Sequence, residues 1–201
     1  MALTGEHAPG ATPLGPEDLE GLKLPNINTF GALNEVEAAN IILGQEWALR
    51  ARVAIGSMLT DRYLQRLHER MFGDVWDWAG EYRMHNTNIG SDYPSIRADL
   101  RVLFDDAADW LANDRFQPDE FVVRVHHRIV KVHPFANGNG RHARMVADMM
   151  LLRHFKRVRL SWGGGTLGNV DPNRERYIAA LREADHNSYA PLLHLARLGT
   201  G

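Results

Sequence analysis

The sequence predicts a mainly α-helical domain of about seven or eight helices with one small β-hairpin flap. Apolar residues recur at intervals of three and four along most of the chain, as on one face of an α-helix. Very few stretches show the alternation of apolar and polar residues that marks a strand. Turn-forming residues concentrate in one stretch between Tyr82 and Pro94, which predicts the flap.

The composition favours a single domain and excludes several classes of protein. The 201 residues suffice for one domain with a sizeable core. The net charge of −2 gives no indication of direct nucleic-acid or membrane binding. No signal peptide is recognisable, and no apolar stretch approaches the roughly 18 residues that span a bilayer. Cysteine is absent, which excludes disulfides and suits a cytoplasmic protein.

The N-terminal part of the chain divides into an arm and a first helix. Residues 1–27 are rich in Gly, Pro, Ala and Thr and are expected to form a loose arm. Residues 28–201 are expected to form the body of the domain. Its first helix is predicted over 33–50, with Glu35 and Glu37 in the first turn, where the helix dipole favours acidic side chains.

The next two helices are each predicted from a cap and an apolar stripe. Thr60 is the expected N-cap of a helix that runs to Met71 and stops at Gly73. Ser95 is expected to cap a longer helix that ends at about Asn113, because apolar residues keep a 3.6-residue period along it.

The C-terminal half contains four further predicted helices. One covers 118–132 and ends there, because the residue before Pro134 is disfavoured in a helix. Another starts near Arg141 and is apolar on most sides, so we expect it to be buried. Asp171 and Ser188 are the expected N-caps of the last two.

Residues 133–144, which read His-Pro-Phe-Ala-Asn-Gly-Asn-Gly-Arg-His-Ala-Arg, carry most of the candidate chemistry. Gly138 and Gly140 let the backbone turn sharply, so that successive N–H groups can surround an anion. The helix N-terminus that follows also favours an anion. Arg141 and Arg144 lie one turn apart on one face, where they could bind phosphate oxygens. The segment is therefore predicted to bind a phosphorylated nucleotide.

His133 lies next to this anion site, and its imidazole could accept a proton from a hydroxyl group near neutral pH. A capping or core role is the alternative for this residue. We assign such core roles to His126, His127 and His142. A zinc site is the other interpretation of these histidines, but the chain has neither a His-Glu-x-x-His motif nor a cysteine.

The same segment resembles the signature of the Fic/Doc family, His-Pro-Phe-x-(Asp/Glu)-Gly-Asn-(Gly/Lys)-Arg-x-x-Arg. Residues 72–80, Phe-Gly-Asp-Val-Trp-Asp-Trp-Ala-Gly, are similar to the family's segment before the flap. Residues 177–193 resemble the C-terminal helices of a subgroup called mobile mystery protein B. The likeness covers most of 30–197 and implies a Fic-type catalytic domain over 28–201, with a β-hairpin flap beside the active site.

Most family members transfer AMP from ATP to a hydroxyl of a target protein, so the resemblance implies adenylylation of Ser, Thr or Tyr. By this analogy His133 is the general base, Arg141 binds the outer phosphates and Arg144 supports them. The α- and β-phosphates would be held by Gly138, Asn139 and Gly140. The target protein would add a strand along the flap, around Asn88, Ile89, Gly90 and Tyr93.

One position departs from the signature, because Asn137 stands where the family has the Asp or Glu that holds Mg²⁺. Mg²⁺ usually binds one or two carboxylates together with nucleotide phosphates. The metal is therefore expected to bind more weakly at Asn137, or the donor or the transferred group differs. The alternatives are a related phosphotransferase, a transferase that uses another NTP, and an inactive nucleotide-binding or partner-binding module.

The resemblance also bears on regulation. Many family members are inhibited by a helix with the motif (Ser/Thr)-x-x-x-Glu-(Gly/Asn), whose Glu pairs with the second arginine of the signature. Residues 33–40 contain Glu37 without the flanking residues of that motif, which makes Glu37 a candidate inhibitory residue. The subgroup is thought to occur with a small helix-turn-helix protein, so the resemblance implies a toxin–antitoxin-like pair.

Overall fold

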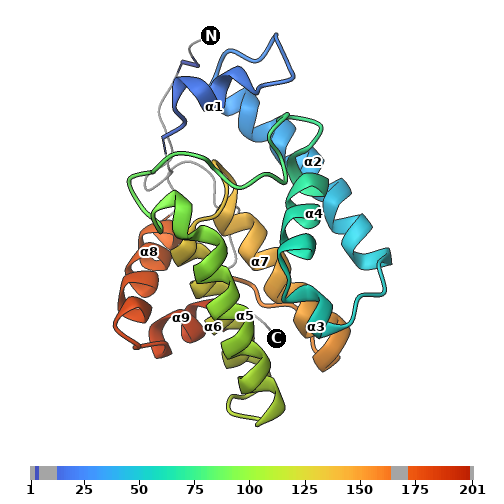
Figure 1. The fold of residues 1–201 in the computed structure, drawn as a ribbon, viewed down its shortest axis with the longest axis vertical. Helices are drawn as coiled ribbons and strands as arrows, with labels where there is room; N and C mark the ends of the chain where they lie inside the picture. Colours follow the sequence, from blue (N-terminus) through green and yellow to red (C-terminus); the bar gives the residue numbers. More distant parts are fainter. Residues whose placement is uncertain (1–2, 5–12, 164–171, 200–201) are drawn as a thin grey trace.

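The computed structural model describes residues 3–4, 13–163 and 172–199. The described residues form nine α-helices and no β-sheet, which confirms the mainly α fold class (Figure 1). The α-helices are α1 (Pro16–Glu20), α2 (Phe30–Arg50), α3 (Ile55–Met58), α4 (Asp61–Phe72), α5 (Ile96–Ala112), α6 (Pro118–Val132), α7 (Asn139–Met150), α8 (Pro172–Asp185) and α9 (Ala190–Arg197). A 3₁₀ turn, η1 (Tyr93–Ser95), precedes α5, and a π-helical turn, η2 (Leu151–Phe155), follows α7.

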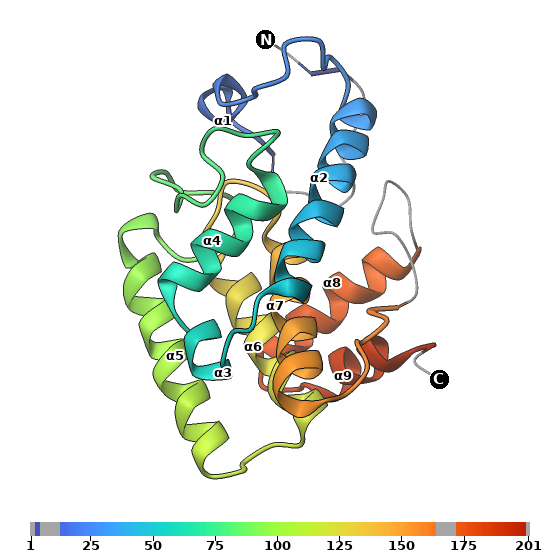
Figure 2. The same cartoon turned by 90° about the vertical axis from the view of Figure 1, so that its right-hand side faces the viewer.

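Helix α7 is the central element of the fold. It packs against α6, α4 and α2, while α8 and α9 pack together beside α6 (Figures 1 and 2). Ala143, Val146, Ala147, Met149 and Met150 of α7 are fully buried. The predicted burial of this helix is therefore confirmed, and the residues at its N-terminus are held by the core.

Several predicted helix ends are confirmed. Thr60 caps α4, because its hydroxyl oxygen accepts a hydrogen bond from the Tyr63 N–H at 3.3 Å. Helix α6 has the predicted bounds, and His133 follows it in the left-handed conformation. Asp171, the expected cap of α8, lies outside the described residues.

Other predicted ends are wrong by a few residues. Helix α2 begins at Phe30, because the Thr29 hydroxyl accepts from the Ala32 N–H at 3.1 Å, and no acidic residue lies in its first turn. Ser95 makes no side-chain cap, because η1 leads directly into α5. Helix α7 starts at Asn139 rather than near Arg141, and Tyr189 rather than Ser188 precedes α9.

The described part of the N-terminal arm lies docked on the body of the domain. Leu22 forms an isolated bridge with Trp76, and the indole N–H of Trp78 donates to the carbonyl oxygen of Asp18 at 2.9 Å. Leu14, Leu19, Leu22 and Leu24 pack against the core. The arm therefore contributes contacts beside the site, whereas the division into an arm of 1–27 and a catalytic domain of 28–201 stays a prediction.

The flap differs from the prediction, because residues 84–92 form an irregular loop without paired strands. Side chains bond to the loop's own backbone. Asn86 Oδ1 accepts from the Tyr93 N–H at 2.8 Å, and the Thr87 hydroxyl donates to the Ile89 carbonyl at 2.6 Å. Such local bonds compete with the cross-strand ladder that a hairpin needs.

In the described ranges, no helix is both long and apolar enough to cross a bilayer.

Candidate active site

A cavity of about 750 Å³ opens between α2, α6, α7, α8 and the flap loop. Its lining includes nearly every site residue predicted from the sequence, namely His133, Asn137, Gly138, Asn139, Gly140, Arg141, Arg144, Asn88, Ile89 and Gly90. Tyr93 is the exception, because it does not line the cavity. It lies at the start of η1, and 39% of its surface is exposed. The tertiary structure also adds Glu37, Arg174 and Tyr177 to the lining.

His133 is held in an uncommon backbone conformation at the end of α6. Its φ and ψ are 54° and 59°, and its N–H donates to the Ile129 carbonyl at 3.0 Å. Burial, and then the nearby positive charge of Arg83, lower the pKa of His133 to about 4. The imidazole is therefore neutral at neutral pH and can accept a proton.

Asn139 shapes the loop that carries the two glycines. Its Oδ1 accepts from the Phe135 N–H at 2.9 Å, and its Nδ2 donates to the Phe135 carbonyl at 2.7 Å. The Phe135 ring is fully buried and stacks on His68, with 3.8 Å between ring centroids. His68 Nε2 in turn donates to the Asn137 carbonyl at 3.0 Å. His68 belongs to no recognisable motif, so nothing in the sequence indicated this support.

Gly138 brings the loop close to the core. It lies at the N-cap position of α7 with φ +79°, and no side chain caps the helix. The N-terminus of α7 therefore opens toward the cavity with its N–H groups and the positive end of the helix dipole, an arrangement that binds anions.

Replacing Gly138 with alanine is expected to lower the free energy of unfolding by about 2–4 kcal/mol, from left-handed strain and overpacking. An added Cβ would lie 2.4 Å from the buried Phe72 ring. Gly140→Ala is the matched control, because its Cβ would meet only the Tyr177 hydroxyl at 3.7 Å. Urea unfolding of both variants measures the difference in their free energies of unfolding, and equal values would contradict the prediction.

Three arginines give the cavity a positive end. The Arg144 Nε donates to the Gly140 carbonyl at 3.1 Å, and burial lowers the pKa of Arg144. Burial also lowers the pKa of Arg174, an arginine that the sequence did not single out. Arg141 keeps 30% of its side chain exposed. Together these side chains can attract a polyphosphate to the N-terminus of α7.

Glu37 is the buried carboxylate of the cavity, with 1% of its surface exposed. Its Oε1 accepts from the Trp76 indole N–H at 2.7 Å and from Asn137 Nδ2 at 2.8 Å. Its Oε2 accepts from Arg141 Nη2 at 2.7 Å. Glu37 therefore pairs with the first arginine of the motif, not with the second, Arg144. The expected helix-end role of Glu37 is wrong, because α2 begins seven residues earlier, at Phe30.

Asn137 has both atoms of its amide group engaged. Its Oδ1 accepts from the Gly138 N–H at 2.7 Å, and its Nδ2 donates to Glu37. Over the described residues no cluster of three or more His, Asp or Glu could hold a metal ion. These donors do not fit a Mg²⁺ site built by the protein alone, and a metal here would depend on the phosphates of a bound nucleotide.

The three histidines to which the sequence assigned core roles, His126, His127 and His142, are buried and bond to other parts of the protein. His126 Nε2 lies 2.9 Å from the Tyr177 hydroxyl, and His127 contacts the hydroxyl of Tyr189 and the carboxylate of Asp185. His142 Nε2 donates to a main-chain carbonyl of α4 at 3.0 Å. These contacts agree with the core roles predicted for them.

The fold thus places a neutral histidine and an open helix N-terminus in one cavity lined by arginines. This is the arrangement of a site that can bind phosphate next to a general base. Residues 58–151 match the model of the Fic/DOC family. Protein adenylyltransferase Fic of Drosophila willistoni is 30% identical over 125 residues, which cover 59% of this chain and 25% of that protein. The chain thus spans about a quarter of the length of that curated relative.

Solved structures share the fold. BepC of Bartonella tribocorum with bound AMPPNP has a TM-score of 0.66 at 17% identity and covers 91% of this chain and 97% of its own. The N-terminal Fic domain of a VirB-translocated Bep effector from Bartonella quintana also has a TM-score of 0.66, at 19% identity. The matched regions cover 86% of this chain and 84% of that domain.

Proposed function

We propose that this protein is a Fic-type adenylyltransferase that moves AMP from ATP to a Ser, Thr or Tyr hydroxyl of a target protein. The observation that carries the proposal is the shared cavity of His133 and the open N-terminus of α7. The name of the Drosophila willistoni relative supports the adenylyltransferase activity, and the AMPPNP bound to BepC supports ATP as the donor.

In this mechanism His133 accepts the proton of the target hydroxyl as the hydroxyl oxygen bonds to the α-phosphorus. The bond from that phosphorus to the bridging oxygen breaks, and pyrophosphate leaves. The loop of Gly138, Asn139 and Gly140 holds the phosphates, and the N–H groups of Asn139 and Gly140 meet the charge that develops on them. The Gly138 N–H, which donates to Asn137 Oδ1, would have to leave that oxygen to take part. Arg141 binds the outer phosphates, and Arg144 supports them.

ATP is the donor of the AMP group. Mg²⁺, when bound to the ATP phosphates, would neutralise their charge. Asn137 is the residue of this protein that we propose to lie nearest the metal. Its Oδ1 already accepts from Gly138, so we expect the phosphates to supply most of the metal ligands.

The target protein is proposed to dock beside the flap loop, where Asn88, Ile89 and Gly90 line the cavity and Ile89 is 47% exposed. Tyr93 extends this docking surface outside the cavity. Membership of the mobile mystery protein B subgroup, a small helix-turn-helix antitoxin-like partner and a cytoplasmic location belong to the same proposal. The subgroup and the antitoxin-like partner rest on the sequence resemblance alone, and the cytoplasmic location rests on the absence of cysteine.

Incubation of the protein with labelled ATP and Mg²⁺, followed by intact-mass measurement, is expected to reveal an adduct of one AMP on itself or on a target. His133→Ala should reduce the rate by about 10²–10⁴-fold, the usual contribution of a general base. Binding of ATP should persist in this variant. An adduct of phosphate or of another nucleotide would favour the alternative transferases. ATP binding without any adduct would leave a nucleotide-binding module.

A further inference from the structure

The buried side chain of Arg83 reaches the backbone of the site from outside the cavity. Arg83 is 4% exposed and is not among the residues that line the cavity. Its Nε donates to the His133 carbonyl at 2.7 Å, and its Nη2 lies 3.4 Å from the Val132 carbonyl. These carbonyls end α6, where the last carbonyls of a helix have no partner within the helix. A cationic side chain therefore completes the helix end that carries His133.

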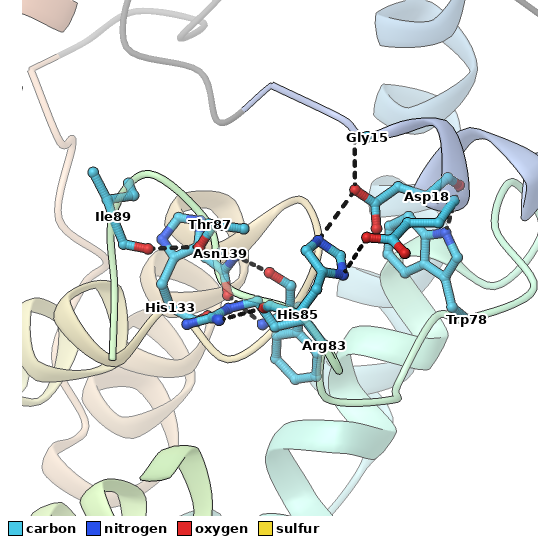
Figure 3. A network of polar contacts seen from close by, with 11 residues as sticks. Gly15, Asp18, Trp78, Arg83, His85, Thr87, Ile89, His133 and Asn139 are labelled. Carbon is cyan, nitrogen blue, oxygen red and sulfur yellow. Dashed lines mark hydrogen bonds and ion pairs between the residues drawn. The ribbon is translucent and has the colours of Figure 1, made fainter. Parts of the chain in front are cut away.

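The same guanidinium also holds the flap loop. Its Nη1 donates to the His85 carbonyl at 2.7 Å, and its Nη2 donates to the Ser91 carbonyl at 2.5 Å. The Ser91 N–H donates to the Val132 carbonyl at 3.1 Å. Figure 3 shows Arg83 between His133 and His85. One planar group thus joins both ends of the loop to the end of α6.

The loop lies directly against His133. A Cβ added to Gly90 would lie 2.6 Å from the His133 Cβ and 2.9 Å from Arg83 Nη2. The histidine is therefore enclosed on one side by the loop, and the loop is kept in place by Arg83. On the far side of the loop, the His85 ring contacts Glu17 at 3.1 Å and Asp18 at 3.5 Å, which ties the loop to α1 (Figure 3).

We propose that Arg83 is a positioning residue of this site, which fixes His133 in its left-handed conformation and holds the flap loop against it, without touching nucleotide or target. The part of the inference that concerns transfer rests on the proposed role of His133 as the base. The positive charge of Arg83 also contributes to the lowered pKa of His133, after burial. The residue therefore acts through both its hydrogen-bond geometry and its charge.

Arg83→Met and Arg83→Lys in the full chain separate these two contributions. Arg83→Met is expected to slow AMP transfer by about tenfold or more, while the dissociation constant for ATP changes by less than about twofold, because Arg83 lies outside the cavity. The pKa of His133, followed by NMR on histidine-labelled protein, should rise. Arg83→Lys keeps the charge but not the planar fork, so it should leave this pKa nearly unchanged and still slow transfer.

His85→Ala is the matched control, because it removes the ring contacts with α1 but keeps the carbonyl that Arg83 binds. It should leave the His133 titration unchanged. Should Arg83→Met fail to fold, Arg83→Lys decides the question. A folded Arg83→Lys protein with the wild-type transfer rate would overturn the positioning role, as would a parallel loss of ATP affinity. If wild-type protein transfers nothing, the proposed function fails, and the His133 titration still tests the effect of Arg83.

Discussion

Replacing Glu37 with glutamine is expected to tighten ATP binding by about tenfold or more, equivalent to about 1.4 kcal/mol or more. In the described structure Arg141 donates to the Glu37 carboxylate at 2.7 Å, and Glu37 is 1% exposed, so that solvent screens the pair poorly. The phosphates of a nucleotide must displace this contact to reach Arg141. Glutamine keeps an oxygen for the Trp76 indole N–H but removes the negative charge. Calorimetric titration with ATP measures the change.

The matched control is Glu35→Gln, which alters the net charge equally on the exposed side of the same helix. It should leave the ATP affinity unchanged. Glu37→Gly should additionally raise self-modification, if Glu37 restrains the site as the sequence hypothesis proposes. An unchanged or weaker affinity in Glu37→Gln would show that this carboxylate does not compete with nucleotide for Arg141.

Replacing Asn137 with aspartate, the residue type of the family signature, is expected to destabilise this protein by about 2–3 kcal/mol at pH 7. Asn137 Nδ2 lies 2.8 Å from Glu37 Oε1, so the substitution places two carboxyl groups in contact at the wall of the cavity, one of them buried. Their repulsion raises the pKa of one of them in the folded state. The folded state then binds more protons than the unfolded state above about pH 4, so stability should fall as pH rises toward 7.

The double variant Glu37→Gln/Asn137→Asp tests this explanation, because it restores a single negative charge at the same place. It should recover most of the stability and remove the added pH dependence, both measured by thermal unfolding between pH 4 and 8. A single variant Asn137→Asp as stable as wild type at pH 7 would contradict the prediction. The pairing also gives a physical reason for asparagine at this position, since an amide can donate to Glu37 and a carboxylate cannot.

The helices with long periodic patterns were the part of the fold that could be predicted. Helix α6 has the predicted bounds, and the cap at Thr60 follows from local chemistry that needs no distant partner. Helices α1 and α3, with five and four residues, are too short to show a period. The flap was mispredicted, because turn-forming residues indicate a change of direction but not whether two strands pair across it.

The sequence by itself determined the segment that we propose to be catalytic, since His133, the glycine loop and the two arginines lie within twelve residues. The two arginines also have the spacing of one helix turn. Only the tertiary structure decided what restrains and supports that segment. Glu37 meets Arg141 across 104 residues, and Arg83 meets the carbonyl of His133 across 50. A hydrogen bond depends on distance and direction in space, and separations of that length in the chain specify neither until the helices have packed.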